Sequence, residues 1–207
     1  MRMITKAKVV LLSLIILFFL AAFRQNTATP RPGPEYTNDK QLKLPENYRE
    51  WVYLTSGFDM SYNPPTTTAS SHHMFDNVFV NPEAYKAFVQ TGTWPDKTIL
   101  VLEARKAEGK GSINQRGNFQ GTEVMAVEVH IKDEARFPGK WAFFGFDEGK
   151  TGKMIPFSAD CYSCHTAHAA VDTTFVQFYP TLLPIAKSKG TLSGSYLKES
   201  EAPPSGQ

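Results

Sequence analysis

The chain has 207 residues, of which 42% are hydrophobic and 20% are charged, and its formal net charge is +2. This length and composition are typical of one globular domain with a hydrophobic core and some additional segments. The chain contains no basic block and its charge is nearly balanced, so we expect no nucleic-acid partner.

The first residues predict export from the cytoplasm. A basic start is followed by the unbroken apolar run VVLLSLIILFFLAAF, from Val9 to Phe23. This run is shorter than the about 20 residues that span a bilayer comfortably, and it suits the apolar part of a signal peptide. No clear cleavage site follows it, so residues 1–24 are either a signal peptide or an N-terminal membrane anchor. In both cases we expect a periplasmic protein, soluble or anchored by this segment.

The segments that flank the folded domain differ from it in composition. Residues 25–41 are rich in Pro, Thr and Asn, which predicts a flexible linker. The last residues are polar and contain two prolines, so residues 190–207 are predicted to be a disordered tail. The folded domain is therefore expected over residues 42–189.

Inside that domain the sequence predicts an α+β fold, mainly an antiparallel β-sheet with a few helices. Stretches rich in β-branched and aromatic residues predict strands over residues 50–56, 74–81, 97–105, 122–133 and 140–147. One helix is predicted between two of them. Asn81 suits its N-cap, Pro82 its first position and Gly92 its end.

The C-terminal stretch SADCYSCHTAHAA carries the only two cysteines of the chain. Ser158 as a capping residue and Asp160 as an early acid predict a short helix. Cys161 and Cys164 lie on it, and His165 follows directly. Such a pair forms a disulfide in many exported proteins. It also occurs in thioredoxin-like enzymes, but their βαβ pattern is absent here.

The histidine makes a third interpretation the strongest. C-x-x-C-H is the motif of covalent haem attachment, in which the two thiols add to the two vinyl groups. A spacing of three puts both sulfurs on one helical face, and the next residue reaches the iron as the proximal ligand. A structural zinc site needs more nearby ligands. We therefore predict one covalently attached haem c on this C-terminal helix, held by Cys161 and Cys164, with His165 as the iron ligand.

A second axial ligand is not marked by any motif. The candidates are Met60, Met74, Met125, Met154, His72, His73, His130 and His168. His168 shares the helix of His165 and cannot easily reach the opposite haem face. Neighbours in a strand point to opposite faces, so at most one of His72 and His73 faces a pocket.

The chain resembles the cytochrome P-460 family, which includes the cytochromes c′-β. The resemblance rests on LPENYREWVYL (44–54), VFVNPEAYKAFVQTGTWPDKTILVLE (78–103), GKWAFFGF (139–146) and CYSCHTAHAAVDTTFVQFYPTL (161–182). It implies an antiparallel sheet domain, a homodimer, and one c-type haem with a proximal histidine and an open distal side. Known activities of the family are hydroxylamine oxidation by the P-460 enzymes and nitric oxide binding by the c′-β members.

Leu102 separates the two activities. The enzymatic members carry a lysine at the matching position, and its amine is cross-linked to the haem edge. A leucine cannot form this bond, and the nearby Lys97 and Lys106 are out of register. The resemblance therefore points to the c′-β type. Oxidation also needs a distal proton acceptor, for which the sequence offers the carboxylates of Asp76, Glu103, Glu123 and Asp147.

The predicted distal pocket is apolar. Its candidate residues are Phe75, Phe79, Leu102, Phe143 and Phe144, each of which also suits the core of the sheet. Phe175, Phe178 and Tyr179 are expected beside the haem on the proximal side. Such a lid offers no hydrogen bond to dioxygen or to an anion, which favours small uncharged ligands such as nitric oxide.

Three functions remain open at this stage. The first is an exported cytochrome that binds nitric oxide or a similar small ligand at an open distal site. The second is a hydroxylamine-oxidising redox enzyme, and the third is a simple periplasmic electron carrier. The sequence does not decide whether the protein is an enzyme, and it identifies no redox partner protein.

Overall fold

The computed structural model describes residues 33–60, 73–147 and 149–201. The predicted signal peptide or anchor, residues 1–24, lies outside these ranges. Among the described residues, no helix has the length and apolar character needed to cross a membrane.

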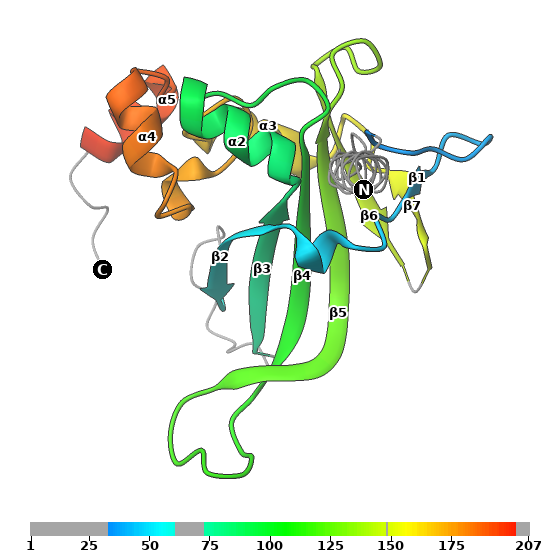
Figure 1. Cartoon of the computed structure of the whole chain (residues 1–207), viewed down its shortest axis with the longest axis vertical. Coiled ribbons are helices and arrows are strands. Elements are labelled where there is room, and N and C mark those ends of the chain that lie inside the picture. The colour runs from blue at the N-terminus through cyan, green and yellow to red at the C-terminus, as the bar shows by residue number, and fades with distance from the viewer. Residues whose placement is uncertain (1–32, 61–72, 148, 202–207) are drawn as a thin grey trace, which may run out of the picture. The chain divides into compact units, whose positions relative to one another are not determined.

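The described residues form one seven-stranded sheet in which every pair of neighbours is antiparallel, so the predicted α+β fold is confirmed. The strands are β1 (Leu42–Lys43), β2 (Val52–Phe58), β3 (Met74–Val80), β4 (Ile99–Glu108), β5 (Phe119–Lys132), β6 (Trp141–Phe146) and β7 (Thr151–Met154), in the order β1-β7-β6-β5-β4-β3-β2. The helices are α2 (Pro82–Thr91), α3 (Asp160–His168), α4 (Leu183–Lys189) and α5 (Gly194–Glu201), with 3-10 turns η1 (Tyr48–Glu50) and η2 (Val176–Phe178). The four helices gather near one end of the long strands (Figure 1).

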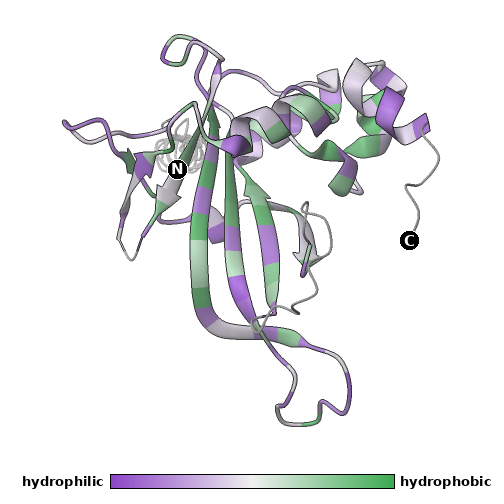
Figure 2. Ribbon diagram, turned by 180° about the vertical axis from the view of Figure 1, so that it is seen from behind, coloured by the Kyte–Doolittle hydropathy of each residue, from purple (hydrophilic) through white to green (hydrophobic). Residues whose placement is uncertain are grey.

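Alternation along the strands sorts apolar side chains onto two faces of the sheet. We call one the helix-covered face, where Leu100 and Trp141 pack in one core with residues of α2 and α4. We call the other the Tyr48 face, where Val101 and Phe144 pack in a second core with Tyr48. Green and purple bands alternate along the long strands in Figure 2, as this sorting requires.

The predicted ends of α2 are confirmed. Asn81 is its N-cap residue, Pro82 begins the helix, and Gly92 ends it in the left-handed conformation with φ of 78°. The Asn81 side chain does not cap the helix, because it accepts a hydrogen bond from the backbone N–H of Ile99 at 2.8 Å and ties α2 to β4.

The predicted cap of α3 is wrong by one residue. Ala159, not Ser158, precedes the first helical residue, and no side chain caps this helix. The reason is a turn before the helix, closed by the Ala159 N–H and the Pro156 carbonyl at 2.9 Å, which encloses Ser158.

The structure also differs from the predicted linker, because part of residues 25–41 is packed. Tyr36 forms a β-bridge with Leu42. The Arg136 guanidinium lies over the Tyr36 ring, 3.9 Å from the ring centroid. Tertiary contacts of one aromatic side chain thus order a stretch whose composition suggests flexibility.

A second difference concerns the predicted tail, because residues 194–201 form α5. The Ser193 hydroxyl accepts from the Tyr196 N–H at 3.1 Å and donates to the Ala169 carbonyl at 2.6 Å. Further along α5, Glu199 pairs with His168 of α3 at 3.1 Å. These contacts with the end of α3 order a polar segment that has little apolar surface of its own.

Candidate functional site

The predicted haem-binding motif lies on α3. Cys161 and Cys164 are one helical turn apart, and both are free, partly exposed thiols. Partial burial raises the pKa of the Cys161 thiol, with a smaller contribution from nearby carboxylates. Among the described residues, no group of three or more His, Cys, Asp or Glu side chains could hold a metal ion.

His165 has the geometry of an iron ligand. Its Nδ1 donates a hydrogen bond to the Thr173 carbonyl at 2.7 Å, which leaves the Nε2 lone pair for a metal. Its ring stacks on Phe175 at 4.1 Å between centroids. Burial lowers the pKa of His165, and the bond to Thr173 offsets this only in part, so the imidazole is neutral at pH 7.

These groups fit the c-type haem that the sequence predicts. Two free thiols of Cys161 and Cys164 and the neutral imidazole of His165 occupy one short helix. Ligating histidines typically donate their second ring N–H to a carbonyl, as His165 does to Thr173. The donor set therefore matches covalent attachment and axial ligation in both type and spacing.

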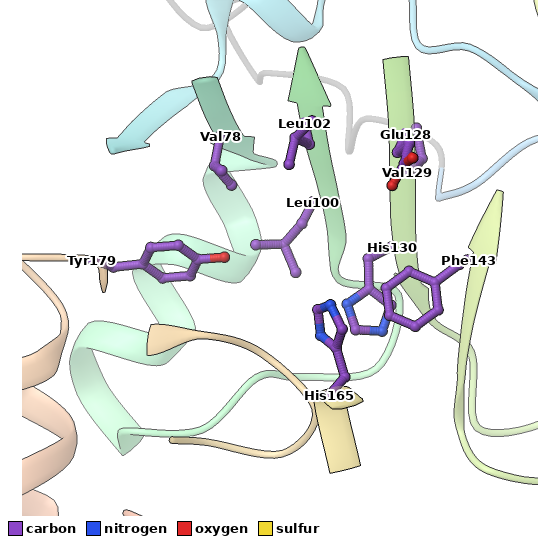
Figure 3. A pocket seen from close by; sticks show the side chains of 9 residues that line it. All are labelled: Val78, Leu100, Leu102, Glu128, Val129, His130, Phe143, His165 and Tyr179. Atoms are coloured by element: carbon purple, nitrogen blue, oxygen red, sulfur yellow. The ribbon is translucent and has the colours of Figure 1, made fainter. Parts of the chain in front are cut away.

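A cavity of about 80 Å³ lies beside His165 on the helix-covered face. It is lined by Val78, Leu100, Leu102, Glu128, Val129, His130, Phe143, His165 and Tyr179 (Figure 3). Cofactor sites commonly hold about 300–1,000 Å³, so this hollow alone would not enclose a haem. The Glu128 side chain is exposed, and the cavity is therefore open along that side.

The structure brings two of the five predicted distal-pocket residues to this cavity. Leu102 and Phe143 line it. Phe79 and Phe144 pack in the core of the Tyr48 face instead. Phe75 lies four residues before Phe79 on the same side of β3, and its ring centroid lies 4.9 Å from that of Phe58. The three phenylalanines that do not line the cavity are displaced by strand alternation, because each occupies the opposite face of its strand.

Among the described candidates for a second axial ligand, His130 is the one that lines the cavity. Its ring stacks on Phe143 at 3.9 Å and lies 5.4 Å from the ring of His165. Its Nε2 lies 3.3 Å from the Thr173 hydroxyl. Burial lowers the pKa of His130 well below 6.5, and the nearby His165 lowers it further, so His130 is neutral. Figure 3 shows the two imidazoles close together beside Phe143.

The other candidates lie elsewhere. His73 pairs with Asp59, and His168 pairs with Glu199. The remaining described candidates do not line the cavity, namely Met60, Met74, Met125 and Met154. His72 lies outside the described residues.

Glu128 is the ionisable residue of the cavity lining that the sequence did not predict. It faces Leu102 across the β4–β5 ladder and lines the cavity. Much of this side chain is exposed, yet its position against the sheet removes part of its hydration and raises the pKa of its carboxyl. The carboxylate of Asp76, whose own pKa is raised by burial, adds repulsion. The alternation that runs from Glu128 to His130 is the signal that could have found it.

The other predicted proton acceptors do not line this cavity. Glu103 lies on the Tyr48 face, where Tyr48, Arg49 and Arg105 donate to it. Glu123 pairs with Lys106 at 3.2 Å.

The lysines near Leu102 are engaged away from the cavity. Lys97 contacts Asp133 at 2.5 Å, and Lys106 pairs with Glu123 at 3.2 Å. Neither lines the cavity, which presents the aliphatic side chain of Leu102.

A comparison with protein families identifies the family of this chain. No curated protein matches the chain. The model of the family described as Cytochrome P460 matches residues 45–176, which covers six of the seven strands and the Cys161–His165 motif. This family implies a haem cofactor and indicates a c-type haem protein. The sequence match and the donor set on α3 lead to one conclusion, that the chain belongs to the cytochrome P460 family.

Proposed function

We propose that this protein is an exported mono-haem cytochrome of the c′-β type that binds nitric oxide or a similar small ligand. Cys161 and Cys164 would hold one haem c by thioether bonds, and His165 would be its proximal ligand. A bound c-type haem would supply an iron that can bind a small ligand. We further propose a periplasmic location and a homodimer, as the family resemblance suggests.

The lining of the cavity is the observation that carries this proposal. Val78, Leu100 and Leu102 present aliphatic carbon on the sheet side. On that side the wall offers no hydrogen bond to a ligand, which favours small uncharged ligands over anions. Leu102 also lacks the amine that a cross-linked enzyme requires, so we expect an intact mass of protein plus haem with no further loss of hydrogen.

Absorption spectra of the mature, full-length protein test this proposal. Haem should stay on the protein after acid–acetone extraction, and the reduced protein should have a five-coordinate c-type spectrum that changes on addition of nitric oxide. His165→Ala should alter the reduced spectrum while the haem stays attached. His168→Ala is the matched control, since this exposed residue of the same helix should leave the spectrum unchanged. Clean extraction of the haem, or an unchanged His165→Ala spectrum, would contradict the proposal.

A second candidate function is favoured by Glu128. Its carboxyl lines the cavity and has a raised pKa, which are properties of a group that accepts a proton from a substrate. Hydroxylamine is the substrate that the family resemblance suggests.

Turnover of hydroxylamine separates the two candidates. Brisk turnover that is lost in Glu128→Gln and kept in Glu123→Gln would favour the enzyme. Glu123 is a suitable control because it lies on the same strand and pairs with Lys106 away from the cavity. Tight nitric oxide binding without turnover would favour the first proposal.

A further inference from the structure

The carbonyl that fixes His165 belongs to a tight turn over residues 171–174. Val171 and Thr174 bond each other through their backbones, at 2.9 Å and 3.4 Å. Asp172 has a positive φ of 52°. Thr173 presents its carbonyl to His165 Nδ1 at 2.7 Å. The orientation of the imidazole therefore depends on where this turn is held.

A buried ammonium holds the turn against the sheet. Lys132, at the end of β5, has a side chain that is only 9% exposed. Its Nζ donates to Asp172 Oδ2 at 3.2 Å and to the Trp94 carbonyl at 2.8 Å. A lysine this buried needs such partners, because an unpaired buried charge is costly. The pair thus connects the sheet to the residue that precedes Thr173.

Two further side chains hold the residues on the other side of Asp172. The Trp94 indole N–H donates to the Thr174 hydroxyl at 2.7 Å. His130 Nε2 lies 3.3 Å from the Thr173 hydroxyl. Side chains from β5 and from the segment after α2 therefore contact the turn from the side of the sheet.

We propose that the ion pair of Lys132 and Asp172 positions the proximal imidazole of His165 through the Thr173 carbonyl, and so tunes electron donation to the iron. This inference rests on the proposed function, in which His165 binds haem iron. A strong bond from Nδ1–H to a carbonyl makes the imidazole a better electron donor. Lys132 and Asp172 are positioning residues, because neither lines the cavity.

Removal of either charge should loosen the turn and weaken the bond from His165. The imidazole then donates less, which lowers the iron–histidine stretching frequency of the reduced protein and raises its midpoint potential. Asp172→Asn is a mild variant, since Asn tolerates a positive φ. Lys132→Met removes the opposite charge and keeps a long side chain.

The two variants together separate positioning from simple electrostatics. Loss of a negative charge near the haem raises its potential, and loss of a positive charge lowers it. If the pair acts by positioning, both variants lower the stretching frequency and both raise the potential. Unchanged frequencies, or potentials that move in opposite directions, would overturn the inference.

The experiment uses resonance Raman spectra and potentiometry of the full-length, haem-loaded protein. Glu123→Gln is the control, because it removes an exposed ion pair with Lys106 elsewhere on the sheet and should shift neither quantity. His165→Ala tests the proposed function separately. If it keeps the iron–histidine band, His165 is not the ligand, and the proposed function fails whatever Asp172→Asn does.

Discussion

The two faces of the sheet surround a glutamate with different partners. Glu103 on β4 and Glu128 on β5 lie on neighbouring strands and point to opposite faces. Glu103 is 2% exposed on the Tyr48 face and accepts hydrogen bonds from Tyr48, Arg49 and Arg105. Glu128 lines the cavity of the helix-covered face, and no residue in the described ranges forms a hydrogen bond or ion pair with it.

The pKa values of the two carboxyls follow from these surroundings. Burial alone would raise the pKa of Glu103, but the hydrogen bonds from Tyr48 and the two arginines outweigh it and lower the pKa. Lost hydration raises the pKa of Glu128, and repulsion from Asp76 raises it further. Glu103 on the Tyr48 face is therefore held as a carboxylate among hydrogen-bond donors, and Glu128 on the helix-covered face is protonated more readily.

The largest expected effect compares neighbouring phenylalanines of β6. Phe144 is 1% exposed in the core of the Tyr48 face, so Phe144→Ala should cost about 3–5 kcal/mol of unfolding free energy. The spectrum with nitric oxide should stay unchanged. Phe143→Ala should cost less, because this ring faces an open cavity, but it should change the nitric oxide spectrum. Urea unfolding measures the stability of each variant, and absorption titration with nitric oxide measures the spectral change. Equal losses of stability in the two variants, with no difference between their spectra, would contradict this prediction.

The next effect concerns the ion cluster of the Tyr48 face. Glu103→Gln leaves Arg49 and Arg105 without their buried counter-charge. We expect it to lower the free energy of unfolding by about 3 kcal/mol. This is at the lower end for a broken buried ion pair, because the Arg49 side chain is 53% exposed. Urea unfolding at pH 7 measures it. Glu128→Gln is the matched control and should lie within about 0.5 kcal/mol of wild type. A similar loss in both variants would remove the distinction between the faces.

The same pair of variants predicts opposite pH dependences. The folded-state pKa of Glu103 is below its unfolded value of about 4.3, so its stabilisation is present above that pH and is lost as pH falls through the folded pKa. The difference in unfolding free energy between wild type and Glu103→Gln should therefore become smaller at acid pH. The pKa of Glu128 is raised, so wild type should gain stability relative to Glu128→Gln as pH falls toward 4.3. Urea midpoints from about pH 2 to pH 8 cover the range in which each carboxyl titrates, and slopes of the same sign for the two variants would refute this prediction.

The sequence alone predicts the long strands but not the short ones. In β4 and β5 the apolar side chains extend over many residues and serve two cores, so composition alone predicts strands. β1 has two residues and β7 has four, with no apolar pattern. They form because they pair with each other, Leu42 opposite Gly152, which is information that no local stretch contains.

The same limit explains the site. Cys161, Cys164 and His165 were predicted because their chemistry lies within five consecutive residues of one helix. The cavity wall comes from several strands, and its members depend on which pleat face each residue takes. A shift of one position moves a side chain to the other face, which is why Phe79 and Phe144 were expected in the wall but pack in the core of the Tyr48 face.

A smaller effect compares two tyrosines on either side of β6. The Tyr162 hydroxyl accepts from the Phe143 N–H and donates to the Ile155 carbonyl, both at 3.0 Å, and so anchors α3 to the sheet. Tyr162→Phe leaves both backbone groups without this partner. We expect it to lower the free energy of unfolding by about 1–2 kcal/mol. Urea unfolding of the haem-loaded protein measures it, and the absence of any loss would show that the hydroxyl does not anchor the helix.

Tyr36 on the Tyr48 face should respond least. Its hydroxyl is buried, and within the described ranges no group forms a hydrogen bond with it. A buried hydroxyl without a partner contributes a desolvation cost and no compensating bond, so its removal should be neutral or slightly stabilising. Tyr36→Phe keeps the ring that packs 6.0 Å from Phe144 and lies under the Arg136 guanidinium. We therefore expect the free energy of unfolding, measured with urea, to change by less than about 0.5 kcal/mol. A loss as large as that of Tyr162→Phe would mean that this hydroxyl is bonded in solution, and the contrast between the two tyrosines would disappear.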